Sequence, residues 1–513
     1  MYPHGLEPEK WNQLMEYSVT RSVAKNTAIM MTTQIVTWVA GLVLLFFLPR
    51  YLGSKGYGEL FLAMSIQAIF WTLVDYGSQE FIPKHISIDR ENASSLFIHS
   101  ASIRVILWLL SMILTIGLCI FSGYSWHLVL LILVLTTSNL WEGMSSLIRG
   151  CFLGFEEMKY PSVAAASRRF FLMATAVPAL LLGAKEVVVV ILMAASTLVS
   201  FLINAKYLKK ILTIHFSIRI RTMVDLLKAG IPYFLLSFFG IVYYRIDAFM
   251  LSMMTPKSVV GWYGASSKLF DILMTFPLIF STALLPVLSR QGKFEYNSMR
   301  NTTGKAIEYM VILGIPIAIA LAFFAKDIVG LLFGLAQFSQ STIILQIFAA
   351  GIVLVYVDFI LGGTTISVDR QRWSAFFSFL AIFVNVGLNF FMIPYFQKSM
   401  ANGGVGAAIA TDVTELFVML ATVFILPRDL FTRKLLYAVT KGLACGVTMA
   451  LAILGGEALG FPWLAQVAIG SVVYGSSLIL TKVFEPAEIE RLLKAFSLKN
   501  LKGIFAQRSE ASA

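Results

Sequence analysis

The sequence predicts an all-α polytopic membrane protein with about 14 transmembrane helices, and two observations carry that prediction. Hydrophobic residues make up 58% of the 513 residues and charged residues only 13%, with a mean hydropathy of +0.80. Soluble domains are roughly 45–50% apolar and about 25% charged. In addition, the gaps between apolar stretches are alternately rich and poor in Lys and Arg. This alternation is typical of a chain that crosses the membrane repeatedly, with its basic loops in the cytoplasm.

Fourteen apolar stretches are long enough to cross about 30 Å of hydrocarbon, which takes roughly 20 helical residues. The seventh and eighth are the hardest to delimit because charges lie inside them. The predicted spans are 27–48, 58–77, 97–121, 127–148, 161–183, 186–205, 229–250, 262–287, 305–325, 341–365, 373–396, 403–426, 436–456 and 462–481.

The basic residues orient these spans. Of the 40 Lys and Arg residues, 29 lie in segments expected in the cytoplasm or, for Lys305 and Lys441, at the cytoplasmic ends of spans; six lie in expected external loops and five deeper inside spans. By the positive-inside rule both termini are expected in the cytoplasm. The net charge of +12 is explained by this topology and by attraction to anionic lipid, so we expect membrane lipids and no nucleic acid as partners. The first apolar run is long enough to be an uncleaved anchor, not a signal peptide.

The order of the spans predicts two six-helix lobes followed by two further helices. The connection 206–228 mixes basic residues with Ile, Leu and Phe, which favours a helix lying in the membrane interface. Spans 13 and 14 have no charge in their cores, and the tail beyond them is expected to form an amphipathic helix. The predicted domains are a cytoplasmic N-terminus 1–26, an N-lobe 27–205, the linker 206–228, a C-lobe 229–426, the C-terminal spans 427–481 and a cytoplasmic tail 482–513.

A weak internal repeat supports the two lobes. Gly58 begins the second span and Pro83 follows 25 residues later, and Gly261 and Pro286 have the same spacing around the eighth span. Both spans of the pair run in the same direction, so they predict parallel repeats related by an axis along the membrane normal.

Ionisable residues inside spans are the candidate site. Each costs about 2.5–3.5 kcal/mol on insertion scales, so such residues are functional candidates by default. We interpret the set of these residues as lining a polar cavity for a cargo that carries phosphate. The cavity candidates are Arg104, Arg168, Arg169, Arg245, Lys268, Asp247 and Asp271. Three acids are candidates for exchanging a coupling proton or sodium ion, namely Asp358, Asp412 and Glu415.

Structural pairing is the competing interpretation of each charge. Lys268 and Asp271 are three residues apart on one helix face and can neutralise each other. Arg245 and Asp247 are two apart and cannot face each other on a helix, so each needs a partner elsewhere.

The sequence contains no recognisable catalytic or metal-binding motif. The three cysteines are far apart, and the five histidines stand in loops or at span ends without metal-ligand spacing. The sequence has no P-loop, nucleophile elbow or HExxH motif. We therefore expect a protein that is not an enzyme and that needs no metal or cofactor.

Three stretches resemble a known family. They are LPRYLGSKGYGELFLAMS at 48–65, the segment 243–290 that begins YYRIDAFML, and NVGLNFFMIPYFQKSMANGGVGAAIATDVTE at 385–415; GFEEMKYPS at 154–162 also fits. Together they resemble the oligosaccharide flippases of the multidrug/oligosaccharidyl-lipid/polysaccharide exporter superfamily. The resemblance implies two lobes around a cationic cavity, with Arg245 and Asp247 of the RID motif lining the cavity or ordering a lobe.

The resemblance also implies a function. The cargo would be an undecaprenyl-diphosphate-linked oligosaccharide, such as an O-antigen, capsule or exopolysaccharide repeat unit. It would be flipped from the cytoplasmic to the outer leaflet of a bacterial plasma membrane by alternating access. A monomer is expected, with a polysaccharide polymerase and other assembly proteins as further partners.

Alternative functions stay open. A multidrug or cation antiporter of the same superfamily would favour acids and aromatics over cations in its cavity. A peptidoglycan-precursor flippase shares the fold. A membrane glycosyltransferase or acyltransferase would need a catalytic Asp or His beside a large acceptor loop, and no loop here is that large.

Overall fold

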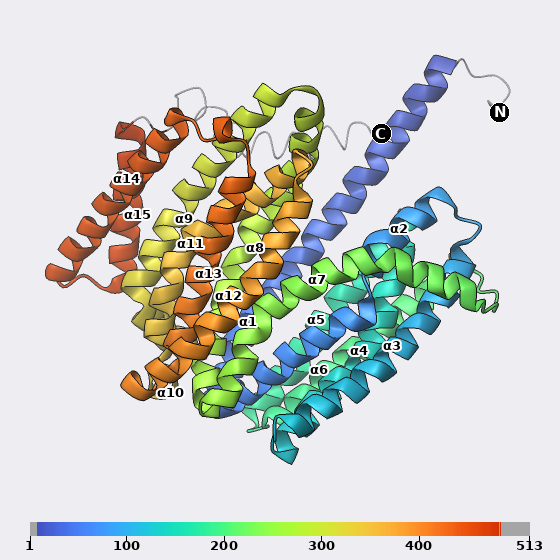
Figure 1. Cartoon of the computed structure of the whole chain (residues 1–513), viewed down its shortest axis with the longest axis horizontal. Coiled ribbons are helices and arrows are strands. Elements are labelled where there is room, and N and C mark those ends of the chain that lie inside the picture. Colours follow the sequence, from blue (N-terminus) through green and yellow to red (C-terminus); the bar gives the residue numbers. More distant parts are fainter. Residues whose placement is uncertain (1–7, 482, 484–513) are drawn as a thin grey trace. The chain divides into compact units, whose positions relative to one another are not determined.

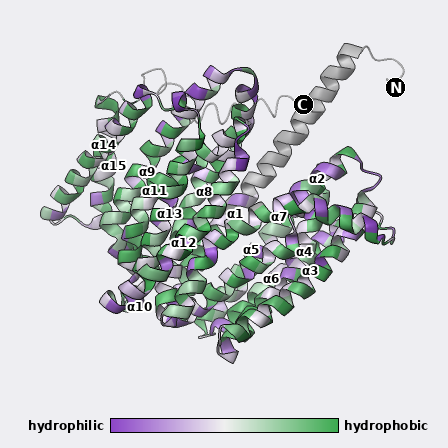
Figure 2. Ribbon diagram, viewed as in Figure 1, coloured by the Kyte–Doolittle hydropathy of each residue, from purple (hydrophilic) through white to green (hydrophobic). Residues whose placement is uncertain are grey.

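The computed structural model of the chain is built from α-helices, and no strand occurs in the residues it describes, which are 8–481 and 483. Figure 1 shows the helices in chain order, and Figure 2 shows hydrophilic residues gathered mainly at helix ends. The helices are α1 (Pro8–Asp75), α2 (Ser78–Ile88), α3 (Ala93–Phe121), α4 (Trp126–Gly154), α5 (Lys159–Leu181), α6 (Glu186–Leu208), α7 (Ile220–Met254), α8 (Lys257–Phe294), α9 (Tyr296–Leu332), α10 (Leu335–Phe338), α11 (Ser341–Ser367), α12 (Gln371–Met400), α13 (Gly403–Ile425), α14 (Arg433–Ala458) and α15 (Trp463–Leu480), with a short 3₁₀ turn at Arg428–Leu430.

The predicted membrane-spanning architecture is confirmed. Twelve helices of the described chain are long and apolar enough to cross a membrane, and a bent pair within α7 makes a thirteenth. The first two predicted spans both lie in α1, which is interrupted at Gly53, where φ is 69° and ψ is 173°. A residue with a side chain rarely adopts this positive φ, so the glycine lets one span pass directly into the next. Counting α1 as two spans gives the predicted fourteen.

The linker between α6 and α7 differs from the helix that its composition suggested. Of the predicted linker 206–228, only the two ends are helical: α6 runs to Leu208, residues 209–219 are not helical, and α7 begins at Ile220. The backbone N–H of His215 donates to Ser94 Oγ at 2.8 Å, and that of Arg219 donates to His99 Nε2 at 2.9 Å. Because these side chains of α3 take up backbone donors, the segment is held extended against α3. The amphipathic helix expected in the tail 482–513 lies outside the described residues, apart from residue 483.

The chain divides into two compact units. The first comprises the described part of Met1–Leu269 together with Val329–Ile344 and Ser378–Thr411. The second comprises Phe270–Ile328, Leu345–Phe377 and the described part of Asp412–Ala513.

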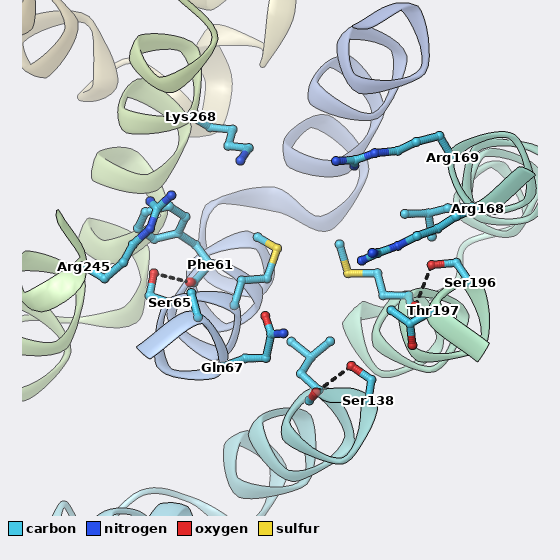
Figure 3. A pocket seen from close by; sticks show the side chains of 15 residues that line it. Phe61, Ser65, Gln67, Ser138, Arg168, Arg169, Ser196, Thr197, Arg245 and Lys268 are labelled. Atoms are coloured by element: carbon cyan, nitrogen blue, oxygen red, sulfur yellow. Dashed lines mark hydrogen bonds between the residues drawn. The ribbon is translucent and has the colours of Figure 1, made fainter. Parts of the chain in front are cut away.

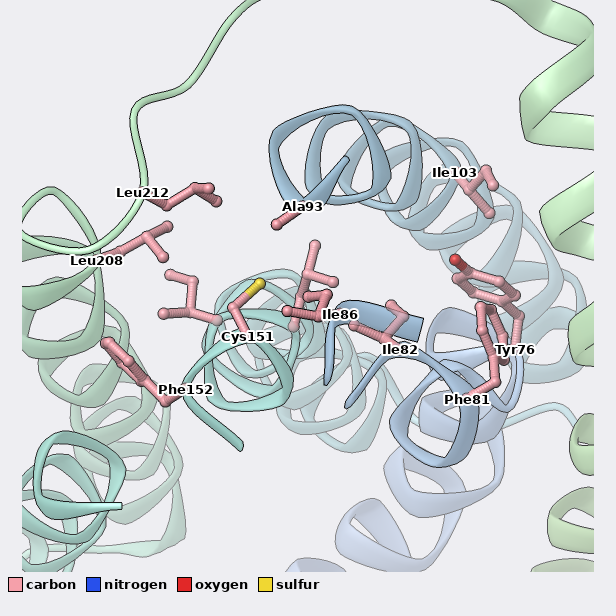
Figure 4. Packing of buried hydrophobic residues seen from close by; sticks show 12 residues of the cluster. Tyr76, Phe81, Ile82, Ile86, Ala93, Ile103, Cys151, Phe152, Leu208 and Leu212 are labelled. Atoms are coloured by element: carbon pink, nitrogen blue, oxygen red, sulfur yellow. The ribbon is translucent and has the colours of Figure 1, made fainter. Parts of the chain in front are cut away.

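The first unit has an apolar core among α2, α3, α4 and α6, shown in Figure 4. Phe81, Ile82 and Ile86 of α2 are almost completely buried in this core, where the Phe81 ring lies 6.0 Å from that of Tyr76. The short helix α2 thus covers the end of the bundle and is fixed by side-chain burial, which contributes about 1.5–3 kcal/mol for each large apolar side chain. All three cysteines of the chain are buried and none forms a disulfide.

The glycines of the sequence repeat meet in the first unit. A Cβ placed on Gly58 would lie 2.8 Å from the backbone N of Gly261, and a Cβ on Gly261 would lie 1.9 Å from the carbonyl oxygen of Ser54. The second half of α1 and the start of α8 therefore cross with their backbones in contact. Only glycine permits so close a crossing, which is the small-residue packing known from membrane helices.

The second unit holds the two C-terminal helices against α9. Tyr474 of α15 donates its hydroxyl to the backbone oxygen of Ile312 at 2.8 Å. In α14, Gly446 lies directly against Ile315. Inside the unit, Tyr356 and Ser281 likewise donate to backbone oxygens, at 2.9 and 2.7 Å. Buried hydroxyls thus find acceptors within the bundle, as an apolar surrounding requires.

Candidate functional site

A cavity of about 250 Å³ opens within the first unit, between the second half of α1, α4, α5, α6, α7 and α8. Figure 3 shows four cationic side chains reaching into it, two of them from the same helix. Arg168 and Arg169 come from α5, Arg245 from α7 and Lys268 from α8. The ends of Arg169 and Lys268 point toward each other from opposite walls. Four of the five intramembrane cations of the sequence therefore line one space.

The cavity wall carries no acid among its described lining residues. A compensating group stands nearby in Glu142 of α4, which forms an ion pair with Arg168 and lies 3.6 Å from Arg149. The guanidinium of Arg245 lies 5.6 Å from the ring centre of Tyr244. Four cations therefore line the wall, and the carboxylate of Glu142 is shared by two arginines; this arrangement favours an anionic ligand.

Neutral polar groups complete the wall. Ser138, Ser196 and Thr197 donate their hydroxyls to carbonyls of their own helices at 2.6–2.7 Å, so their oxygens keep lone pairs for a ligand. Gln67 donates to Asn139 Oδ1 at 2.5 Å and is drawn at the edge of the cavity in Figure 3. Such groups suit the hydroxyls of a sugar. They were missed at the sequence level because single Ser, Thr and Gln residues are common in spans.

The structure places Arg104 away from this cavity. Its side chain is fully buried within the first unit, and Nη2 lies 2.8 Å from Asp75 Oδ1. It also donates to Ser146 Oγ at 2.8 Å, to the backbone oxygen of Gly143 and to the hydroxyl of Ser78. A guanidinium with this many partners ties α1, α2, α3 and α4 together, so it acts in the structure of the unit.

Asp247 also lies outside the cavity wall, in a buried polar cluster of the first unit. Tyr263 and Thr411 donate to its Oδ2, each at 2.8 Å. Asn389 donates to Oδ1 at 2.6 Å and to Asn385 at 2.9 Å. Hydrogen bonds from neutral groups on α8, α12 and α13 thus surround one carboxylate, while Arg245, two residues earlier, faces the cavity. The one sequence signal for this cluster was the pair of asparagines four residues apart in an apolar helix.

The remaining predicted acids lie in the second unit. Asp271 follows Lys268 on α8 and is half-buried. Asp358 of α11 and Asp412 of α13 each have a buried Oδ1 without a hydrogen-bond partner among the described residues. Asp412 lies directly against Gly351: a Cβ placed on Gly351 would come within 2.3 Å of Oδ1 of Asp412. Glu415, one turn further along α13, is also buried.

Comparisons with known proteins agree with this arrangement. The sequence profile of the polysaccharide biosynthesis protein family matches residues 23–291, and the MatE profile matches residues 232–391. The chain is similar to the probable low-salt glycan biosynthesis flippase Agl15 of Haloferax volcanii, with 25% identity over 176 residues. That match covers 34% of this chain and 36% of Agl15, so the chain matches only about a third of that relative's length.

Two solved structures share the fold. The lipid II flippase MurJ in an inward closed conformation has a TM-score of 0.72 at 13% identity, over 91% of this chain and 100% of that chain. An inward-facing multidrug resistance MATE family transporter has a TM-score of 0.62 at 15% identity, over 82% of this chain and 98% of that chain. The profile match spans just over half of the sequence, so the chain belongs to the polysaccharide biosynthesis protein family, within the multidrug/oligosaccharidyl-lipid/polysaccharide superfamily of flippases.

Proposed function

We propose that this membrane protein flips an undecaprenyl-diphosphate-linked oligosaccharide, such as an O-antigen, capsule or exopolysaccharide repeat unit. The observation that carries the proposal is the cavity lined by Arg168, Arg169, Arg245 and Lys268 with no acid in its described wall. Agl15, which the chain resembles over about a third of its length, is described as a glycan biosynthesis flippase, and this supports a glycan cargo.

The chemistry of such a cargo fits the wall. A diphosphate carries negative charge that Arg binds through paired N–H groups and Lys binds as a point charge. The hydroxyl and amide groups of Ser138, Thr197 and Gln67 suit the sugar. A lipid tail can remain in the hydrocarbon, so the cavity has to hold only the polar head. We propose transport from the cytoplasmic to the outer leaflet of a bacterial plasma membrane by a monomer with both ends in the cytoplasm, working with a polymerase and other assembly proteins.

The alternatives differ in what the cavity must bind. A multidrug antiporter exporting organic cations would place a positive ligand among four positive side chains, which costs several kcal/mol for like charges in close contact. The peptidoglycan-precursor flippase remains a second candidate, because its cargo also carries a diphosphate and the MurJ fold covers 91% of this chain. A glycosyltransferase finds no support in the family matches.

Binding of the cargo to purified protein tests the proposal. In Arg245→Gln and Lys268→Gln, the loss of one hydrogen bond to a charged group costs about 1.5–3 kcal/mol, so the Kd for a fluorescent undecaprenyl-diphosphate oligosaccharide should rise about tenfold to a hundredfold. The matched control is Arg90→Gln, which removes a cation that is 55% exposed beside Glu156 and should leave the Kd unchanged. Export of organic cations by wild-type proteoliposomes that ignore lipid diphosphates would overturn the proposal. Rescue of a strain depleted of its peptidoglycan-precursor flippase would favour the second candidate.

We further propose that Asp358, Asp412 and Glu415 couple transport to an ion gradient. The support is the pair of buried carboxylate oxygens on α11 and α13 that lack hydrogen-bond partners among the described residues. A buried carboxylate oxygen without a hydrogen-bond partner is costly unless a proton or a cation reaches it. Flipping that proceeds at the same rate after both proton and sodium gradients are collapsed would remove this part of the proposal.

A further inference from the structure

Four charged or titratable side chains meet on the side of the first unit that is expected to face the outside: one lies in α1 just after its interruption at Gly53, and the others lie in the first turns of α4, α6 and α8. His127 Nδ1 lies 3.2 Å from Glu59 Oε2, and His127 Nε2 lies 3.1 Å from Glu186 Oε1. The ammonium of Lys257 forms an ion pair with the other oxygen of Glu59 and lies 3.3 Å from Ser125 Oγ. We refer to Glu59, His127, Glu186 and Lys257 as the outer cluster. All four lie in the first unit.

The hydrogen-bond geometry of the outer cluster suits a protonated His127. A neutral imidazole has one N–H donor and one acceptor nitrogen, whereas the imidazolium has two donors. Here both ring nitrogens face carboxylate oxygens, which only accept. Both contacts are therefore hydrogen bonds only when His127 is protonated. In that state two carboxylates are balanced by one imidazolium and one ammonium, which suits Glu59, whose side chain is only 6% exposed.

A metal ion fits this arrangement less well. The ligand atoms of Glu59, His127 and Glu186 lie within 4.8 Å of one another, but a single metal would use only one imidazole nitrogen. The two carboxylates contact opposite sides of the ring, and Lys257 already neutralises one of them. These contacts favour a proton over a divalent cation.

The other groups near His127 do not compete for the proton. Tyr124, in the α3–α4 turn, hydrogen-bonds Ser252 at 2.6 Å, and burial raises the pKa of its hydroxyl, so it stays neutral. Tyr124, Ser125 and Ser252 line a cavity of about 210 Å³ together with Glu59 and Lys257. The outer cluster contains one histidine, and histidine is the side chain that ordinarily changes charge between pH 5 and 8.

We propose that the outer cluster is a proton-operated latch. When His127 is protonated, it holds the second half of α1, where that half begins, to the outer ends of α4 and α6, and Lys257 joins α8 to them beside the Gly58–Gly261 crossing. When the proton leaves, one imidazole nitrogen presents its lone pair to a carboxylate oxygen at about 3 Å and the cluster carries a net negative charge, so these helix ends separate. Acid on the outer side keeps the latch closed, and neutral to alkaline pH releases it.

The latch deepens the proposed function by adding control of the outer opening, but it can be tested without any cargo. Leu62 lines the neighbouring cavity and is buried, so Leu62→Cys reports opening through its reaction with a membrane-impermeant maleimide. After correction for the ordinary pH dependence of a free thiol, measured on a small-molecule thiol, the reaction should be about tenfold faster at pH 8 than at pH 5.5. His127→Gln should abolish this pH dependence. The control variant His215→Gln alters an exposed histidine of the α6–α7 linker and should retain it.

A second variant, Glu186→Gln, tests the hydrogen bonds to His127 independently. In Glu186→Gln the amide can donate to the unprotonated ring nitrogen, so the latch should stay closed, and the maleimide reaction of the Leu62→Cys background slow, at both pH values. A pH dependence that survives in both His127→Gln and Glu186→Gln would refute the latch. A second result would also refute the latch by identifying a metal site instead. In that result, micromolar Zn²⁺ slows the maleimide reaction of the otherwise wild-type cluster at pH 8, and EDTA speeds it at pH 5.5. A failure of cargo binding with an intact pH response would instead count against the proposed function alone.

Discussion

Removing Asp75 should destabilise the protein far more than removing an acid from its surface. Asp75→Asn takes away the charge partner of Arg104, whose guanidinium is fully buried and 2.8 Å from the carboxylate. Breaking a buried ion pair in this way costs about 3–5 kcal/mol. The Arg90–Glu156 pair is 3.6 Å apart and its side chains are 55% and 71% exposed, so Glu156→Gln should cost about 1 kcal/mol or less.

Equilibrium unfolding in mixed detergent and SDS, followed by tryptophan fluorescence, measures both losses. The double variant Arg104→Met, Asp75→Leu should recover most of the stability, because apolar replacements of a whole buried pair are often neutral. The recovered variant should also bind the lipid diphosphate with unchanged Kd. If it folds but has lost binding, Arg104 contacts the cargo and its placement as a structural cation is refuted. If Asp75→Asn costs no more than Glu156→Gln, the buried network is refuted.

Three further expectations concern the other buried features. Gly261→Ala should lower the free energy of unfolding by about 1–3 kcal/mol through backbone overlap, while Gly240→Ala, where a Cβ meets nothing within 4 Å, should not; equal stability of the two would contradict the close crossing. Asp247→Asn should cost about 1–3 kcal/mol in the same assay, because an amide turns one of its accepting oxygens into a donor facing other donors; an unchanged free energy of unfolding would contradict the cluster. Asp412→Asn should make flipping insensitive to ion gradients and the exposed Asp327→Asn should not; equal sensitivity of both variants would argue against coupling.

The fold could be predicted almost completely from the sequence. Each of the fourteen predicted spans coincides with a helix or with part of one, because the hydrocarbon core demands long apolar stretches wherever the chain crosses it. The linker was the exception. Its apolar and basic composition favoured an interfacial helix, but hydrogen bonds to Ser94 and His99 hold it extended. Contacts to a distant helix cannot be read from local composition.

The candidate site was predictable by residue type but not by location. The insertion cost of charges pointed to five cations, and four of them line one cavity. Arg104 carries the same cost, yet its partner Asp75 lies 29 residues away on another helix, and no local pattern connects them. The neutral donors around Asp247 come from three helices, and only the asparagine pair of α12 stands out in the sequence. His127 was not a candidate at the sequence level, because the two carboxylates that it contacts are distant in sequence, at positions 59 and 186.

The burial of Cys119, Cys151 and Cys445 has a practical consequence for following the transport cycle. None of the three thiols is accessible in this conformation or tied into a disulfide. Reporter cysteines for labels, crosslinkers or spin probes can therefore be introduced into the native chain without first replacing its own, provided that the labelling of the unsubstituted chain is measured as the background. Labelling of the wild-type protein then becomes a measurement in itself, since any native thiol that reacts during turnover marks a helix face that the resting protein conceals.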